Sequence, residues 1–244
     1  MIKIAIFSDV HGNLPALKTV LKDIKEKGIQ YQFCLGDLVD FAPWCNEVIE
    51  IIRQENILCL LGNHDERIAF DQTLIPLEKH SEAETNARNQ AINHTRKAIS
   101  EENKNYLSQL PFNAKLNYKV GKKHWKIQLV HASLNSNDTY IYESENDNTF
   151  RKLANEADAD IVVMGHTHIS FKKKIDDLWF VNCGSVGRSK EENRLASYLS
   201  INLFEDKIIP EIVQIPYPIE ETIEAIENSE IPNFYSEFLR NKKS

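Results

Sequence analysis

The stretch I-V-V-M-G-H-T-H, residues 161–168, contains a pattern that recurs along the chain. Four apolar residues, three of them β-branched, run into a glycine and two histidines, and such a short apolar run is typical of a buried strand. Side chains two residues apart point the same way where the chain stays extended, so we expect His166 and His168 to face one point. Neutral imidazole is the commonest protein metal ligand near neutral pH. The stretch therefore predicts a strand with metal ligands at its carboxyl end.

Four other apolar runs end in the same kinds of residue. Residues 2–7 lead into Asp9 and His11, residues 31–35 into Asp37 and Asp40, residues 57–61 into Asn63 and His64, and residues 125–130 into His131. Further strands are expected at about 179–182, 195–204 and 207–215, and helices at about 14–27, 46–54 and 149–158 and around residues 219–226. Alternating strands and helices predict an α/β core. The strand-rich carboxyl half favours mixed sheets, with a two-sheet sandwich covered by helices as one arrangement.

The strand–helix alternation stops between about residues 70 and 110, which are polar with helical propensity. We expect two helices inserted there between strands, the second closed by Pro111. The insertion either forms a wall or lid beside a site or packs on the flank of the domain. The polar, acidic residues 135–148 are expected to form a solvated loop.

Length and composition limit the class of protein. The 244 residues fit a single domain, residues 1–244, and the net charge of −7 argues against a partner such as a membrane surface or long nucleic acid. Four scattered cysteines form no C-x-x-C pair, so a zinc ribbon has little support. The amino terminus does not resemble a signal peptide, and no apolar run approaches the length that spans a bilayer. We expect a cytoplasmic protein with reduced thiols.

The motifs at the five strand ends indicate a metal site only when they are considered together. Each motif alone has an ordinary structural explanation, such as a helix cap, a Gly-Asn turn or a core histidine. Ligands of α/β sheets bind outside the carboxyl ends of strands, and five of the eight histidines fall there. A mixed set of imidazole, carboxylate and amide groups suits Zn²⁺, Mn²⁺ or Fe rather than Ca²⁺. A carboxylate that bridges two ions about 3.5–4 Å apart would unite the set into one site.

In this order the motifs resemble those of the calcineurin-like metallophosphoesterase superfamily, D-x-H, G-D-x-x-D, G-N-H-[DE], H and G-H-x-H. The segments S-D-V-H-G-N-L-P-A-L, N-C-G-S-V-G, R-L-A-S-Y and P-Y-P-I are similar to a compact bacterial and archaeal branch, often described as phosphodiesterases or diadenosine-tetraphosphatase-like proteins. The likeness covers nearly the whole chain. It implies a four-layer α/β/β/α sandwich of two mixed sheets with the helical insertion.

The resemblance also implies a role for each motif residue. Asp9, His11 and His168 would bind a first metal, Asn63, His131 and His166 a second, and Asp37 would bridge the two. His64 would be the general acid, and Asp40 would hold its tautomer and orientation. The implied cofactors are two divalent ions, Mn²⁺ foremost, with Fe, Zn²⁺ or Ni²⁺ as alternatives.

The chain departs from the family pattern in places. Members of this branch often have proline where Cys183 stands and a Q-P-R-like segment at residues 188–190. The protein serine/threonine phosphatases carry an arginine where this chain has Phe41, so a phosphate clamp is missing there. Arg67 and Arg188 are candidates to replace it and to bind substrate.

We therefore expect a metal-dependent phosphoric ester hydrolase that acts on a small phosphate ester or nucleotide. Phosphodiesters or dinucleoside polyphosphates are the expected substrates, and a phosphomonoester is the alternative. A non-catalytic scaffold on the same fold is a second alternative, which the presence of His64 disfavours. A nuclease is a third, but the family's DNA-repair members carry additional domains. Oligomeric state and the native metal stay open.

Overall fold

Two five-stranded β-sheets form the centre of the protein in a computed structural model, which describes residues 1–76 and 81–241. The first sheet has the order β10 (Ile208–Ile215), β9 (Ala196–Leu203), β1 (Ile2–Phe7), β2 (Tyr31–Cys34) and β3 (Leu58–Cys59). The second has the order β4 (Asn113–Val120), β5 (Lys123–Val130), β6 (Ile161–Met164), β8 (Leu178–Asn182) and β7 (Phe171–Ile175). The described helices are α1 (Leu14–Glu26), α2 (Cys45–Gln54), α3 (Asn63–Ala69), α4 (Glu82–Ala98), α5 (Glu101–Ser108), α6 (Asp147–Glu156), α7 (Ile219–Glu227) and α8 (Phe234–Arg240).

Both sheets are mixed, and their parallel strands lie together. Strands β1, β2 and β3 run parallel, and β9 and β10 continue that sheet antiparallel. Strands β5, β6 and β8 run parallel, with β4 and β7 antiparallel at the two edges. Parallel neighbours bring their carboxyl ends to one edge of a sheet, which is where α/β proteins bind ligands.

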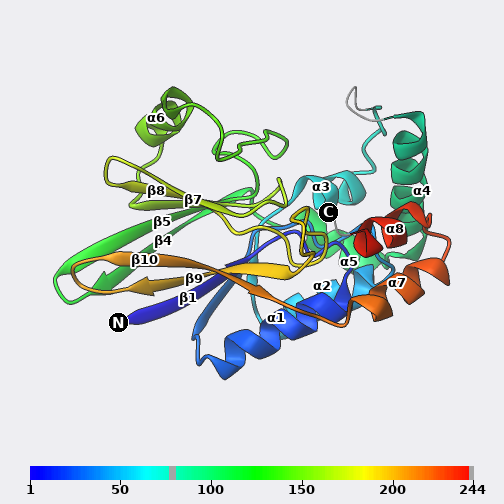
Figure 1. The fold of residues 1–244 in the computed structure, drawn as a ribbon, viewed down its shortest axis with the longest axis horizontal. Helices are drawn as coiled ribbons and strands as arrows, with labels where there is room; N and C mark the ends of the chain where they lie inside the picture. Colours follow the sequence, from blue (N-terminus) through cyan, green and yellow to red (C-terminus); the bar gives the residue numbers. More distant parts are fainter. Residues whose placement is uncertain (77–80, 242–244) are drawn as a thin grey trace.

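The stretch 161–164 is apolar throughout because strand β6 is buried on both faces. Ile161 and Val163 belong to the core between the two sheets, whereas Val162 and Met164 pack in the cluster beneath α6. Strand β1 divides its side chains in the same way, between the inter-sheet core and the cluster under α1 and α2. The layers run from α1 and α2 through the two sheets to α6 (Figure 1). The α/β prediction and the implied four-layer sandwich are confirmed.

The helical insertion forms largely as predicted. Helices α4 and α5 occupy residues 82–108, and each begins at a serine, Ser81 or Ser100, whose hydroxyl accepts a backbone N–H of the first turn. Helix α4 stands at one end of the molecule beside α7 and α8, far from α6 (Figure 1). Within the described residues, no helix is long and apolar enough to cross a membrane.

Some elements differ from the prediction. Strand β3 is only Leu58–Cys59 rather than residues 57–61, because pairing with β2 involves two residues. Four elements were not predicted, namely α3, β4, β7 and α8. Strand β4 alternates exposed and half-buried positions at a sheet edge, and β7 reads F-K-K-K-I, so neither has the apolar run used as a signal.

Candidate metal centre and substrate cleft

The seven side chains implied as metal ligands come together where the parallel strands of both sheets end. None is more than 7% exposed, and they are Asp9, His11, Asp37, Asn63, His131, His166 and His168. Helix α1 follows Asp9 and His11, α3 begins at Asn63, and the others lie in loops after β2, β5 and β6. Sequence positions more than 150 residues apart thus contribute to one buried, polar cluster.

One group consists of Asp9, His11, Asp37 and His168, which offer ligand atoms within 4.8 Å of one another. The Nε2 atoms of His11 and His168 are 3.1 Å apart. His168 Nε2 is 3.2 Å from Asp9 Oδ1, and His11 Nε2 is 3.8 Å from Asp37 Oδ2. Two carboxylates and two imidazoles therefore point at a space of ionic size.

A second group shares Asp37 with the first. Asp37, His131 and His166 also offer ligand atoms within 4.8 Å of one another. The amide oxygen of Asn63 completes this group, since its Oδ1 is 3.1 Å from His131 Nε2 and 3.1 Å from His166 Nδ1. One carboxylate common to two groups is the arrangement that a bridging ligand requires.

Backbone carbonyls orient three of the histidines. The Nδ1 atoms of His11, His131 and His168 lie 3.0, 2.9 and 2.8 Å from the carbonyl oxygens of Val39, Leu35 and Arg188, to which only a protonated Nδ1 can donate. In the neutral imidazole the Nε2 atom then carries a lone pair. This is the outer-shell arrangement that fixes metal-ligating histidines in other proteins.

The lone pairs that result face one another, which tests whether a cation fits. Burial holds the pKa of His11 well below its ordinary value and lowers that of His168 to about 4, so both rings are neutral near pH 7. Their Nε2 atoms at 3.1 Å are then two acceptors in contact. Such a contact is repulsive unless a cation lies between the atoms. The donor set thus fits a bound metal ion.

The carboxylates of Asp9 and Asp37 also fit a bound cation. Asp9 Oδ2 accepts the backbone N–H of His166 at 2.9 Å, and Asp37 Oδ1 accepts that of His64 at 2.8 Å. Within the described residues, the other oxygen of each carboxylate is buried and accepts no hydrogen bond, although an imidazole Nε2 lies 3.2 Å from Asp9 Oδ1 and another lies 3.4 Å from Asp37 Oδ2. Burial alone would lower the pKa of His131, but the charge of Asp37 raises it to about 10. The shared carboxylate therefore strongly favours positive charge beside it.

The backbone does not continue extended past β6, which corrects the prediction from the spacing of His166 and His168. Both residues have left-handed φ angles, 66° and 62°, and they join different groups rather than one point. Asp9, His11 and Asp37 also have positive φ. Strained backbone of this kind gathers at functional sites, where the surrounding structure holds it.

His64 and Asp40 pair beside the two groups without joining either. His64 Nδ1 is 2.6 Å from Asp40 Oδ2, and the imidazole ring centre is 5.0 Å from that of His11. The side chain of His64 is 13% exposed and lines a cleft, whereas Asp40 is buried. The imidazole is therefore the polar group that a bound molecule can reach.

Asp65 was missed by the sequence analysis. Its carboxylate accepts the backbone N–H groups of Asp37, Leu38 and Gly62 at 2.7, 2.8 and 3.2 Å. These bonds tie the loop after β2 to the start of α3. In the sequence, Asp65 looked like part of the G-N-H-D turn, and only the distance between loops reveals its function.

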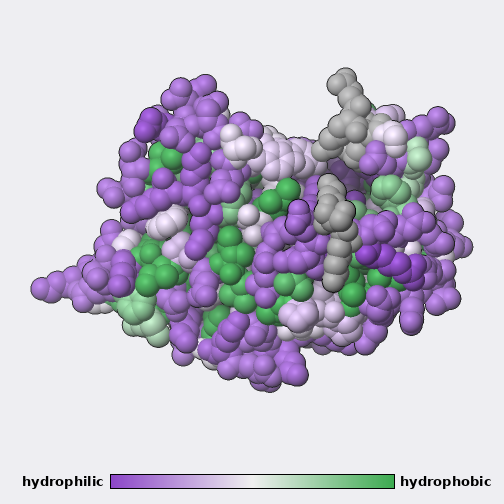
Figure 2. All heavy atoms as spheres, viewed as in Figure 1, coloured by the Kyte–Doolittle hydropathy of each residue, from purple (hydrophilic) through white to green (hydrophobic). Residues whose placement is uncertain are grey.

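A cleft of about 730 Å³ opens above His64 and Asn63. The surface is hollowed between the α6 side and the α4 side of the molecule (Figure 2). Four cationic side chains and six aromatic rings line the cleft, namely Arg67, Arg88, Arg188 and Lys190, and Phe41, Tyr140, Tyr142, Phe234, Tyr235 and Phe238. Both candidate substrate-binding residues, Arg67 and Arg188, are among them. The insertion contributes to the wall through α4.

The segment 135–148 is not wholly the solvated loop that we predicted. Asn137 and Ile141 are buried, and the ring of Tyr140 lies 4.2 Å from that of His166. Tyr142 stacks on Tyr140 with an interplanar angle of 15°. The polar composition hid two aromatic residues that belong to the cleft.

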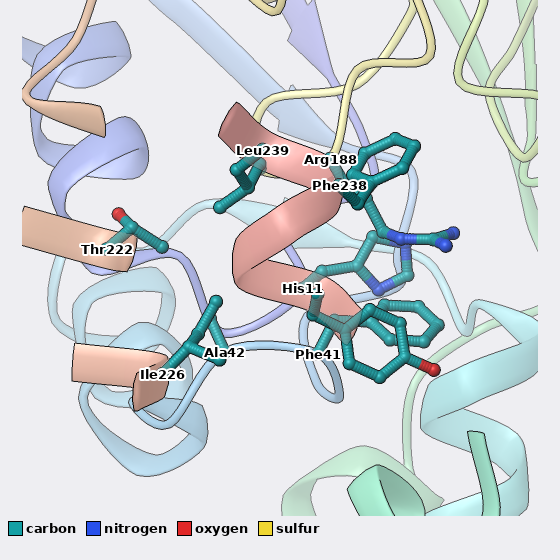
Figure 3. A pocket seen from close by; sticks show the side chains of 10 residues that line it. His11, Phe41, Ala42, Arg188, Thr222, Ile226, Phe238 and Leu239 are labelled. Atoms are coloured by element: carbon teal, nitrogen blue, oxygen red, sulfur yellow. The ribbon is translucent and has the colours of Figure 1, made fainter. Parts of the chain in front are cut away.

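Arg188 supplies a positive charge close to the place where the resemblance left an arginine missing. Its guanidinium lies 4.2 Å over the ring of Phe41 and 4.8 Å from that of Phe238. Phe41 in turn lies 4.7 Å from the ring of His11. Figure 3 shows these side chains gathered beside helix α8, which carries Phe238. Helix α8, which was not predicted, therefore closes one side of the centre.

Comparison with known proteins identifies the family. The model of the calcineurin-like phosphoesterase superfamily domain matches residues 2–205. The chain belongs to this superfamily. An uncharacterized protein of Methanocaldococcus jannaschii is 33% identical over 253 residues, covering 97% of this chain and 96% of that protein. As a member of the superfamily, the chain is a metal-dependent phosphoester hydrolase whose Asp and His groups could hold divalent metals.

Solved structures show the same fold. A metallophosphoesterase from Sphaerobacter thermophilus superposes with a TM-score of 0.77 at 23% identity and covers 99% of both chains. A hypothetical protein from Pyrococcus horikoshii OT3 superposes with a TM-score of 0.81 at 20% identity over 98% of both chains. The calcineurin-like sandwich of this chain thus extends through α7 and α8, beyond the residues that the family model matches.

Proposed function

We propose that this member of the superfamily is a binuclear phosphodiesterase that cleaves phosphodiester or dinucleoside-polyphosphate bonds. The observation that carries the proposal is the pair of ligand groups with Asp37 in common. We assign Asp9, His11 and His168 to one ion, Asn63, His131 and His166 to the other, and Asp37 to both. The donors suit Mn²⁺ best, because oxygen and nitrogen ligands are mixed and no thiolate is among them.

When bound, two divalent cations supply Lewis acidity that neutralises phosphate charge and makes hydroxide available near neutral pH. The protein holds the ligand side chains in place. A bond forms between hydroxide oxygen and phosphorus while the bond from phosphorus to the leaving oxygen breaks. The leaving oxygen takes the electron pair and needs a proton.

His64 is assigned as the donor of that proton. Its Nδ1 is engaged by Asp40 at 2.6 Å, which leaves Nε2 as the nitrogen that can donate. Its side chain reaches the cleft while Asp40 is fully buried, so only the imidazole can touch the substrate. Asp40 is a positioning residue, because it acts through His64.

The cleft supports a substrate larger than a simple monoester. A volume of about 730 Å³ lies in the range that encloses drug-sized ligands. Tyr140 and Tyr142 offer faces on which a base can stack, and arginines offer charge for phosphates. A nucleotide with at least one phosphoric diester or anhydride bond combines these features.

The experiment is a hydrolysis panel on protein stripped of metal and refilled with Mn²⁺. It compares p-nitrophenyl phosphate, bis(p-nitrophenyl) phosphate and diadenosine tetraphosphate. Faster turnover of the diester or the dinucleotide supports the proposal. Preference for the monoester would make the protein a phosphatase, and no turnover of any ester with two bound ions would mean a non-catalytic protein.

A further inference from the structure

Two buried arginines line the cleft, and binding of metal ions by the two ligand groups does not account for their presence. Arg67 lies on α3 and Arg88 on α4, and their residues are 8% and 7% exposed. Both line the cleft that contains His64. We propose that Arg67 and Arg88 form a second anion subsite, which binds a phosphate carried by the leaving group of the substrate. The inference rests on the proposed function and narrows its substrate class.

Buried guanidinium groups need hydrogen-bond partners. Arg67 Nη1 is buried without a hydrogen-bond acceptor in the described part of the chain. Arg88 donates from Nη1 to the carbonyl of Ile75 at 3.2 Å. Among the described residues, the salt bridges formed by arginines are those of Arg53 and Arg240, and none involves Arg67 or Arg88. A buried cation with an unsatisfied donor is costly, and an anion in the cleft would satisfy it.

Arg67 and Arg88 bring two like charges to one cleft. Burial lowers the pKa of Arg88, and the charge of Arg67 lowers it further. A guanidinium stays protonated in proteins, so this repulsion persists in the folded chain. Two adjacent arginines bind one phosphate group with paired hydrogen bonds, which relieves the repulsion.

The acidic groups around the subsite are engaged elsewhere or stand apart. Asp40, whose charge favours the protonated form of Arg88, is paired with His64. Glu84 lines the cleft, but its carboxylate accepts the backbone N–H of Ser81 at 2.8 Å in the capping box of α4. Asp138 lines the cleft without an ion pair to either arginine. Asp40 and Glu84 are therefore engaged by other partners rather than by the two guanidinium groups.

The position of Arg67 relative to His64 indicates on which side of the scissile bond the anion would lie. His64 and Arg67 are three positions apart on α3, so their side chains are neighbours on one helix face. If His64 protonates the leaving oxygen, then the leaving group passes His64 on its way out of the metal centre. Arg67 is the next side chain along that face. An anion held there belongs to the leaving group and not to the phosphate on the metals.

The test uses the full chain loaded with Mn²⁺ and two kinds of ester. The leaving group of bis(p-nitrophenyl) phosphate carries no further phosphate, whereas that of diadenosine tetraphosphate does. Arg67→Gln and Arg88→Gln should each lower kcat/KM on diadenosine tetraphosphate by at least about 10-fold, since a hydrogen bond to a charged group is lost. The same variants should change kcat/KM on the nitrophenyl diester less than about 3-fold.

A 5′-phosphorylated dinucleotide is the second phosphate-bearing substrate of the test. Its leaving nucleoside carries a separate phosphate, whereas the leaving group of diadenosine tetraphosphate carries a polyphosphate chain. Whichever of the two substrates is sensitive to the arginines identifies the source of the anion. Arg151→Gln, an exposed arginine of α6, removes the same charge as a control and should alter kcat/KM on neither substrate. Equal losses on all esters, or no loss on either phosphate-bearing substrate, would overturn the subsite.

A binding measurement separates this inference from the proposed function. Inorganic tripolyphosphate is titrated into metal-stripped protein by calorimetry. The wild type should bind it, and the double variant Arg67→Gln/Arg88→Gln should bind at least about 10-fold more weakly. Binding without hydrolysis of any ester would remove the proposed function and keep the subsite. Absence of binding to the wild type, or equal affinity of the variant, would remove the subsite even if the esters are hydrolysed.

Discussion

The seven polar side chains at the strand ends and the cleft above them are built in different ways. We call the first the floor (Asp9, His11, Asp37, Asn63, His131, His166 and His168) and the second the wall (Arg67 of α3, the cleft residues of α4 and α8, and residues 138–142). Floor residues follow β-strands, are nearly buried and are tied to backbone groups. Wall residues stand on helices and a loop, and several are half-exposed.

The difference assigns separate tasks to the two regions. The side chains of five of the seven floor residues, all but Asn63 and His166, hydrogen-bond to backbone groups. These bonds hold the ligand atoms in one geometry, as metal chemistry requires. A wall of long arginines and aromatic rings adapts to the shape of a substrate. Changes in the floor should therefore affect every substrate and metal content together, whereas changes in the wall should affect substrates selectively.

The largest effect is expected for Asp37→Asn, which removes the charge common to both ligand groups. Metal content should fall below two ions per chain, and kcat/KM should fall about 10³-fold or more on all esters alike. Elemental analysis and the hydrolysis panel measure the two quantities. Asp206→Asn, at an exposed turn between β9 and β10, is the matched control. Full metal content with unchanged turnover would show that Asp37 is not the shared ligand.

His64 lies between floor and wall, and its replacement should separate chemistry from metal binding. His64→Ala should lower turnover of esters with poor leaving groups by roughly 10²–10⁴-fold, because the leaving oxygen loses its proton donor. The loss should be smaller for nitrophenyl esters, since nitrophenolate leaves without a proton. Metal content should stay unchanged, and His124→Ala on the exposed face of β5 should be silent. An equal loss on both kinds of ester would refute the acid assignment.

The floor was predictable and the wall was not, for physical reasons. Floor residues lie directly after apolar runs in the sequence. In a stretch such as residues 161–168, the run that predicts a strand is followed at once by residues that can bind a metal. Tyr140 belongs to a polar segment, and Asp65 and Arg88 owe their importance to distant parts of the chain. The spacing of His166 and His168 misled because their backbone turns through positive φ. Local patterns carry no information on such turns.

Substitution of Gly165 tests how rigidly the floor residues are held. A Cβ atom at Gly165 would lie 2.3 Å from Ser8 Oγ and 2.6 Å from Asp9 Oδ2, so Gly165→Ala must displace the Asp9 carboxylate. Metal affinity should fall about 10- to 100-fold. Gly28→Ala is the control, because nothing lies within 4 Å of its Cβ and only its φ of 63° is strained. The control should lose about 1 kcal/mol of stability and no metal affinity, as denaturant unfolding and metal titration would show.

The smallest effect is expected away from both regions, where α1 is fastened to β9. Asp23 Oδ2 accepts hydrogen bonds from Tyr198 at 2.6 Å and from Lys27 at 2.7 Å, and these bonds lower its pKa although burial opposes them. A carboxyl with a lowered folded pKa stabilises the protein above its unfolded pKa of about 3.9, and this stability is lost as the pH falls through the folded value.

Lys27 is nearly half-exposed, so solvent screening limits the coupling to about 0.3–1 kcal/mol. A double-mutant cycle of Asp23→Asn and Lys27→Gln should show this coupling from pH 5 to 8 and lose it below pH 4. Ester hydrolysis and metal content of the variants should equal those of the wild type at pH 7. A coupling that persisted below pH 4 would mean that the protonated carboxyl binds Lys27 equally well. An altered metal content would mean that α1 transmits strain to Asp9 and His11, and the floor would then depend on more than its own backbone bonds.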